Sequence, residues 1–142
     1  MKTQTTHPTL TIDYKNLFQS LTAAYIVFGV DDPTFTILEE NDAHAAIAMQ
    51  QRERVIGRPL FDVFPDTSVQ YRETGVSELL QSIRKVIRTG KPDTMPRLNY
   101  DLKDQHGQLQ QKYWSVSHHP VFSVDGKVKA VYQATEDVTE TV

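Results

Sequence analysis

The chain has 142 residues with 39% hydrophobic side chains, a formal net charge of −3 and no cysteine, which fits one globular domain. The missing cysteine excludes disulfides, thiolate nucleophiles and cysteine-ligated metals, and the small negative charge gives no electrostatic reason to expect nucleic acid or an anionic membrane as partner. Because the chain has no run of about 20 apolar residues and its N-terminus lacks the apolar core of a signal peptide, we expect a cytoplasmic protein.

The first part of the chain predicts a helix outside the sheet. Residues 1–9 indicate a flexible tail, and residues 10–22 indicate a helix whose start Asp13 can cap. Apolar side chains recur on this helix at helical spacing. They are Tyr14, Leu17, Phe18 and Leu21. Such a stripe needs a surface to cover, which is either the sheet or a partner chain.

Two strands and several short helical segments follow. The apolar and β-branched runs 24–30 and 34–39 predict a strand hairpin. Asn41 is the expected N-cap of a helix that reaches to about residue 51. Residues 52–64 predict two short helical turns, because Gly57 and Pro59 interrupt the helical pattern.

The clearest helical stripe in the chain predicts one long helix. Its apolar residues are Val76, Leu79, Leu80, Ile83, Val86 and Ile87. Thr74 can cap its start after a polar loop over 66–73, and Gly90 and Pro92 end it in the usual order.

Three strands complete the pattern. The run 94–103 alternates between apolar and polar residues, and Asp125-Gly126 joins the runs 113–122 and 128–134. Asp-Gly between such runs is the strongest short-range hairpin signal, and it predicts a type I′ turn with positive φ at both central residues. Because strands and helices are segregated along the chain, we expect an α+β fold with one antiparallel sheet.

Several short motifs, in their order along the chain, resemble those of the PAS domain, a sensor module of bacterial signalling proteins. They are Asn41-Asp42-Ala43, the run from Gly57 to Pro65, Tyr113-Trp114, Pro120-Val121 and Glu136-Asp137-Val138-Thr139. The resemblance implies a five-stranded antiparallel sheet with short helices and one long helix on one face, plus an N-terminal helix. It implies a PAS domain over 23–139, with 140–142 as the start of a truncated linker to an output domain.

The resemblance also implies a sensory function without catalysis by the domain itself. The subgroup of PAS domains that these motifs most resemble often lies at the N-terminus of bacterial sensor histidine kinases. We therefore expect an output domain of that kind, either attached or as a partner. The chain is then either a fragment of a longer protein or a stand-alone module. Family members often dimerise through the N-terminal helix, which makes its apolar stripe the candidate homodimer interface; the alternative is a monomer in which this helix folds onto its own sheet. The signal is expected to leave through Asp137, Val138 and Thr139.

The pocket of the family lies between the sheet and the long helix. Fifteen side chains are candidates to line it here: Ile26, Phe28, Met49, Phe61, Phe64, Leu80, Ile83, Ile87, Leu98, Tyr100, Trp114, Val116, His118, Val131 and Gln133. The polar members are the most informative, because a pocket needs a few polar groups to orient its ligand. Strand alternation puts His118 on the same face as Trp114 and Val116. The alternative is that these side chains simply pack together as a core.

Metal, haem and covalent flavin are all disfavoured. Neighbouring His118 and His119 point to opposite faces of a strand and cannot chelate one ion, and no histidine spacing resembles a zinc site. Haem-binding members of the family use a histidine on the long helix, where residues 74–89 contain none, and members that form a flavin adduct need a cysteine. The cofactor is therefore unknown. Non-covalent flavin has no positive support, and we expect either a small organic ligand or no ligand at all.

Two other functions stay open. A ligand-free dimerisation and interaction module would have a filled core, whereas a sensor would have a cavity of roughly 300 Å³ or more. A small α+β enzyme, of the ketosteroid-isomerase-like or cyclase-like kind, would need a buried ionisable group with a perturbed pKa, for which His118 is the candidate.

Overall fold

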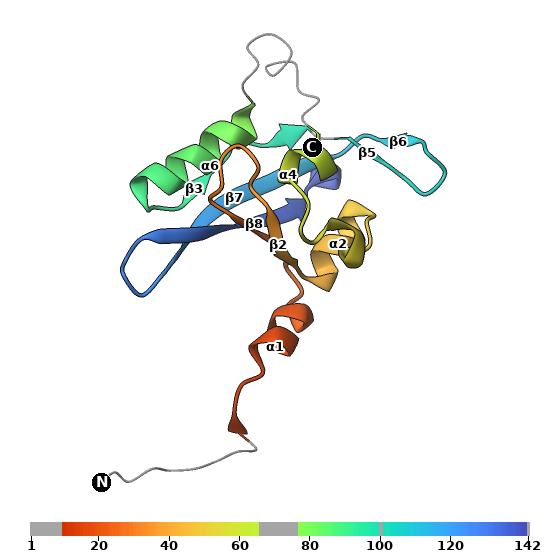
Figure 1. Cartoon of the computed structure of the whole chain (residues 1–142). Helices are drawn as coiled ribbons and strands as arrows, with labels where there is room; N and C mark the ends of the chain where they lie inside the picture. The colour runs from red at the N-terminus through yellow and green to blue at the C-terminus, as the bar shows by residue number, and fades with distance from the viewer. Residues whose placement is uncertain (1–9, 66–76, 100, 142) are drawn as a thin grey trace, which may run out of the picture.

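The fold is seen in a computed structural model, which describes residues 10–65, 77–99 and 101–141. A twisted antiparallel sheet carries helices on one face, which we call the inner face (Figure 1). The helix α1 (Tyr14–Ser20) extends away from this body. The predicted α+β class with one main antiparallel sheet is confirmed.

Four strands form the main part of the sheet in the order β2-β1-β8-β7. They are β1 (Ala24–Gly29), β2 (Ile37–Glu40), β7 (Tyr113–Phe122) and β8 (Val128–Asp137). The last of them, β8, lies in the centre, where it pairs with β1 on one side and with β7 on the other. The predicted hairpins β1–β2 and β7–β8 are therefore joined side by side through β8.

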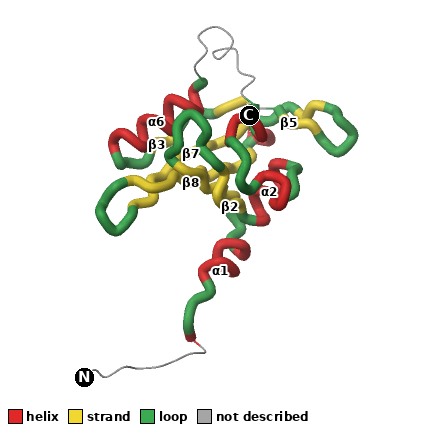
Figure 2. Tube along the Cα trace, in the orientation of Figure 1, coloured by secondary structure: helices red, strands yellow, loops and turns green. Residues whose placement is uncertain are grey.

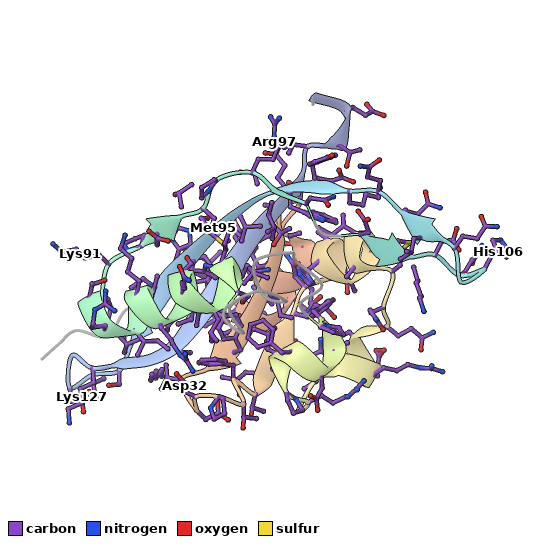
Figure 3. The ribbon with its side chains drawn as sticks, turned by 90° about the horizontal axis from the view of Figure 1, so that it is seen from above. Asp32, Lys91, Met95, Arg97, His106 and Lys127 are labelled. Atoms are coloured by element: carbon purple, nitrogen blue, oxygen red, sulfur yellow. The ribbon has the colours of Figure 1, made fainter. Side chains whose placement is uncertain are left out.

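The predicted strand over 94–103 is divided into short pieces. Two of them, β3 (Asp93–Thr94) and β4 (Leu98–Asn99), pair separately with β7 and bring the sheet to six strands. The third piece, β5 (Leu102–Lys103), pairs with β6 (Leu109–Gln110) in a small hairpin that projects beyond the sheet (Figure 2). His106 at its tip and Lys127 at the tip of the β7–β8 hairpin lie at opposite ends of the molecule (Figure 3).

Within residues 10–65 and 77–99, four helices cover the inner face. They are α2 (Asp42–Ala48), α3 (Arg52–Val55), α4 (Leu60–Val63) and α6 (Glu78–Thr89). The side chain of Asn41 caps α2 by accepting the N–H of His44, as expected. The cap of α6 is Ser77, whose hydroxyl accepts the N–H of Leu80, while the expected cap Thr74 lies outside the described residues. Gly90, with a φ of 69°, ends α6 as predicted.

The turn between β7 and β8 differs from the predicted type I′. Between the strand ends, Ser123 donates its N–H to the carbonyl oxygen of Lys127, so three residues form the tip of the hairpin. Of these only Gly126 has positive φ, at 85°, whereas type I′ needs positive φ at two residues. The Oδ1 of Asp125 instead accepts the N–H of Lys127, so a side-chain acceptor stabilises the longer turn.

The core lies between the inner face and the helices. One buried cluster joins Ile26, Phe28 and Val131 of the sheet to Ile83 and Val86 of α6. A smaller cluster holds Met95, Trp114 and Val116 and is packed against Ile47 and Leu79. The space between these two clusters is where the candidate site is found.

Candidate functional site

A partly open cavity of about 70 Å³ lies between the inner face of the sheet and the helices. Its walls come from β1, β4, β7 and β8 of the sheet and from α2, α4 and α6. The lining residues are Ile26, His44, Ile47, Ala48, Leu60, Phe61, Phe64, Leu79, Ile83, Leu98, Trp114, Val116, Gln133 and Thr135. The wall is mainly aliphatic and aromatic, and the side chains that carry hydrogen-bonding groups are His44, Trp114, Gln133 and Thr135.

Eight of the fifteen candidate pocket residues border this cavity. They are Ile26, Phe61, Phe64, Ile83, Leu98, Trp114, Val116 and Gln133. The structure places six others elsewhere. Phe28 and Val131 are fully buried in the larger core cluster, and Leu80 and Ile87 pack against it. Met49 is 40% exposed at the C-terminal cap of α2. His118 does not border the cavity and instead contacts Gln133, which does. Tyr100 is outside the described residues.

The sequence reasoning missed the wall that α2 supplies. His44, Ile47 and Ala48 follow one another at helical spacing and face the cavity together. That spacing is visible in the sequence, but α2 is only seven residues long and rich in alanine, so its apolar face is narrow. On β8, Thr135 follows Gln133 with the two-residue period of a strand, and alternation alone would have found it.

A buried acid–base pair borders the cavity on the α2 side. Glu40, at the end of β2, is fully buried, and its Oε1 lies 2.5 Å from Nδ1 of His44 one helical turn later. The ring of His44 packs edge-on against Phe64, with the centroids 5.8 Å apart. The second carboxylate oxygen of Glu40 has no hydrogen-bond partner among the described residues. Only one of the two carboxyl oxygens of Glu40 is therefore hydrogen-bonded within the described residues.

A chain of hydrogen bonds runs from the cavity through His118 to the surface. Gln133 Oε1 lies 2.9 Å from His118 Nε2, and His118 Nδ1 lies 2.7 Å from the Ser82 hydroxyl on α6. That hydroxyl also lies 2.7 Å from Asp93, whose other oxygen accepts from Lys85 at 3.1 Å. The chain therefore connects a cavity wall on β8 to the exposed side of α6.

Burial lowers the pKa of the His118 imidazole from its ordinary 6.5 to about 4, although the hydrogen bond with Gln133 opposes the shift. The imidazole is therefore neutral at pH 7, and only one of its nitrogens carries a hydrogen. If Ser82 donates to His118, then Nε2–H donates to Gln133. If Ser82 donates to Asp93, then Nδ1–H donates to Ser82, and the bare Nε2 requires the amide N–H of Gln133. The orientation of the Gln133 amide is linked to the hydroxyl of Ser82.

The end of β8 is fixed to the start of β7. Thr139 accepts the backbone N–H of Tyr113 at 3.1 Å, and Asp137 accepts the backbone N–H of Thr139 at 3.0 Å. Val138 donates its N–H to the carbonyl oxygen of Tyr113, and Lys112 pairs with Asp137 at 3.1 Å. The hydrogen bond from the Thr139 hydroxyl, together with Lys112, holds the pKa of the Asp137 carboxyl below its usual range. The three predicted exit residues are therefore joined to the strand that carries Trp114.

The outer face of the sheet carries aromatic residues next to α1. Tyr132 packs edge-on with Tyr25 at 5.7 Å and is stacked with His119 at 4.6 Å. His119 thus lies on the opposite face from His118, as alternation predicts. Phe18 of α1 reaches Tyr25 with a centroid distance of 6.4 Å. The remaining apolar residues of the stripe are exposed, with Tyr14 at 71%, Leu17 at 47% and Leu21 at 39%.

Within the described residues, no three histidine, cysteine or carboxylate side chains gather as a metal site would require. None of the helices described is long and apolar enough to cross a membrane.

The chain belongs to the PAS-fold family, whose model matches residues 18–142. No curated protein sequence matches the chain. Many solved structures share the fold, and their low sequence identity means that they show the fold alone.

Three of these solved structures are useful for comparison. An RNA-binding Light-Oxygen-Voltage receptor matches with a TM-score of 0.67 and 19% identity. The match covers 90% of this chain and 33% of the receptor chain. A sensory box sensor histidine kinase from Vibrio cholerae matches with a TM-score of 0.58 and 18% identity, over 89% of each chain. The Vibrio cholerae receptor VqmA matches with a TM-score of 0.62 and 21% identity, over 93% of this chain and 54% of VqmA. VqmA is also among the matches as a complex bound to DPO.

Proposed function

We propose that this chain is the sensory part of a cytoplasmic bacterial signalling protein and that it binds a small organic molecule in the cavity between the sheet and the helices. The observation that carries the proposal is the cavity itself, a mainly apolar space with four hydrogen-bonding side chains on its wall. Pockets for small molecules have this composition, because apolar contact supplies affinity and a few polar groups fix orientation. Membership of the PAS-fold family supports a sensory role over catalysis.

The signal would pass along β8. Gln133 and Thr135 touch the cavity, and Asp137 ends the same strand two residues later. A ligand that prefers one orientation of the Gln133 amide also prefers one arrangement of His118 and Ser82, and it shifts the population between two states of β8 and α6. Coupling free energies of about 1–3 kcal/mol are typical of such shifts. Asp137, Val138 and Thr139 would carry the difference to the next element.

The output module in this proposal is a histidine kinase, attached to or partnered with the domain. The similarity in fold to a sensor histidine kinase supports it. The similarity to VqmA, a receptor with target DNA, favours a DNA-binding output as a second candidate. In both cases the domain itself, with its net charge of −3, would contact neither nucleic acid nor membrane, and α1 would form a homodimer.

The alternative is a ligand-free interaction module. The cavity of about 70 Å³ is well below the roughly 300–1,000 Å³ of pockets for drug-sized ligands. A ligand of this domain must therefore be small, or the helices must move apart to admit it.

Native mass spectrometry of freshly purified protein tests the proposal. We expect a bound small molecule in the wild type and its loss in Leu79→Phe, which fills the cavity from α6. Leu80→Phe is the matched control, because Leu80 is the next residue on the same helix and does not border the cavity. Ligand retained in Leu79→Phe would place the binding site elsewhere, and an empty wild type across growth conditions would favour the interaction module.

A further inference from the structure

The buried pair of Glu40 and His44 determines what the cavity offers to a ligand. The ring of His44 borders the cavity, and its Nδ1 is already used by Glu40 at 2.5 Å. Any hydrogen bond from the ring to a bound molecule must therefore use Nε2. Among the described residues, Nε2 makes no hydrogen bond of its own.

The number of protons on the pair decides whether Nε2 donates or accepts. A contact of 2.5 Å between a ring nitrogen and a carboxyl oxygen requires one hydrogen between them. If that were the only hydrogen, the pair would carry a net charge of −1 inside the protein. With a second hydrogen on Nε2 the pair is neutral overall, whether the shared hydrogen belongs to Glu40 or to His44.

Within the described part of the chain, His44 is the one basic side chain paired with Glu40. The side chain of Glu40 is fully buried, and its Oε2 has no partner among the described residues. Arg52 is already paired with the neighbouring Glu39, at 2.5 Å. An unpaired buried charge costs several kcal/mol, so the neutral pair with hydrogen on Nε2 is the stable state.

We infer that Glu40 and His44 place a hydrogen-bond donor, the Nε2–H of His44, on the wall of the cavity, and that the ligand is a small, mostly apolar molecule carrying a hydrogen-bond acceptor such as an ether, ketone or ring nitrogen. Glu40 is a positioning residue, because it fixes the ring and keeps the hydrogen on Nε2. The aliphatic and aromatic wall around His44 takes the rest of the molecule. This inference rests on the proposed small-molecule function and specifies its chemistry.

Two matched probes test the inference. Tetrahydrofuran and cyclopentane are five-membered rings of nearly the same shape, and only the first has an acceptor. Their affinities are measured by NMR titration against the wild type and against the double variant Glu40→Leu/His44→Phe. The double variant removes both members of the pair together, which avoids leaving an unpaired buried charge. The ratio of the tetrahydrofuran affinity to the cyclopentane affinity is compared between the wild type and the variant. The hydration free energy of each free probe is the same in both titrations, so it cancels in this comparison.

We expect the tetrahydrofuran-to-cyclopentane affinity ratio to fall about tenfold in the double variant, which corresponds to about 1.4 kcal/mol. In the control His106→Phe, which replaces an exposed histidine of the β5–β6 turn far from the cavity lining, the ratio should stay at the wild-type value. An unchanged ratio in the double variant, or a fall in the control alone, overturns the inference and leaves small-molecule binding intact. Absence of binding by both probes to the wild type counts against the inference and the proposed function together.

A long-range ¹H–¹⁵N spectrum of the wild type provides a second test that needs no substitution. It should show a protonated Nε2 on His44 at neutral pH. A bare Nε2 would make His44 an acceptor and would reverse the predicted ligand chemistry.

Discussion

His118 is the residue at which burial and hydrogen bonding oppose each other. The imidazole is fully buried between α6 and β8, with Phe28 packed edge-on at 6.5 Å. A histidine of this kind matched the requirement for a small enzyme, which needs a buried group with a perturbed pKa. Its position argues against that use, because Ser82 and Gln133 occupy both ring nitrogens and separate the ring from the cavity. His118 is suited to coupling the hydrogen bond of Gln133 on β8 to the hydrogen bond of Ser82 on α6.

Acidification should destabilise the fold through His118. Its pKa is about 4 in the folded state and near 6.5 in the unfolded state, so the unfolded chain takes up the proton first as the pH falls. Between these values the free energy of unfolding should drop by up to about 1.4 kcal/mol per pH unit, or about 3 kcal/mol over the whole window. Above pH 6.5 this contribution is fully present. Urea unfolding at a series of pH values measures the slope.

His118→Gln should remove that part of the slope, whatever its effect on stability at pH 7. His106→Gln, in the exposed turn between β5 and β6, is the control and should keep the wild-type slope. An identical pH dependence in wild type and His118→Gln would show that the imidazole is not buried in its neutral form.

Trp114 is the second residue with a clear energetic role. It is 5% exposed and contributes to both the smaller core cluster and the cavity wall. Trp114→Ala should lower the free energy of unfolding by about 3–5 kcal/mol, since it enlarges a cavity that helices cannot fully close. Tyr113→Ala, at the half-buried neighbouring position on β7, should cost less. Chemical denaturation measures both, and a loss below about 1 kcal/mol for Trp114 would contradict its role in the core.

Alternation along a strand was sufficient to assign faces to single residues. It placed His118 with Trp114 and Val116 and put His119 on the other face, as the structure shows. It could not supply the partners of His118, because Ser82 lies 36 residues away on another element and Asp93 lies on β3. Glu40 and His44 are close in the sequence, but the acid ends a strand and the base belongs to the following helix, so their spacing alone does not show that they pair inside the protein.

At the scale of elements, α1 has an apolar face with little of its own molecule to cover. None of its residues is buried. Phe18 contacts Tyr25, and Gln19 donates to the carbonyl oxygen of Glu40 at 3.0 Å, so its last turn is fixed while its first turn extends away (Figure 1). This arrangement supports the proposed homodimer, in which α1 packs against a second copy.

If α1 forms the proposed homodimer, replacing Leu17 and Phe18 by glutamate should dissociate it, because the charges would be buried without partners at the interface. Sedimentation velocity measures the change from dimer to monomer. Lys15→Glu on the same helix is the control and should remain dimeric. A double variant with the sedimentation coefficient of the wild type would exclude α1 from the interface.

Elements with strong local signals were predicted well, and those that depend on tertiary pairing were not. The cap at Asn41 and the end of α6 at Gly90 follow from side-chain and backbone chemistry within a few residues. The alternating run 94–103 was predicted as one strand, but only its parts opposite β7 pair there, and the rest folds back as the β5–β6 hairpin. The turn at Asp125-Gly126 adopted a three-residue form, which two letters of sequence do not distinguish from type I′.

At the scale of the whole molecule, the order of helices and strands was sufficient for the α+β class, and the motifs were sufficient for the family. The cavity was not predictable in size, because whether facing side chains meet or leave space depends on fractions of an ångström in the packing of α2 and α6. The sequence reasoning proposed fifteen lining residues and could not separate the eight at the cavity from those that fill the core.

The central position of β8 has a consequence for how the protein is made. Its pairs with β1 join residues more than a hundred positions apart, such as Ala24 and Thr135. During synthesis on the ribosome, β1 can pair with β2 early, but its other edge has no partner until β8, near the end of this sequence, has emerged. Chains dominated by such distant pairings fold slowly and expose hydrophobic surface until folding is complete. Helper chaperones that shield nascent Ile26 and Phe28 would matter more for the yield of this domain than its modest size suggests.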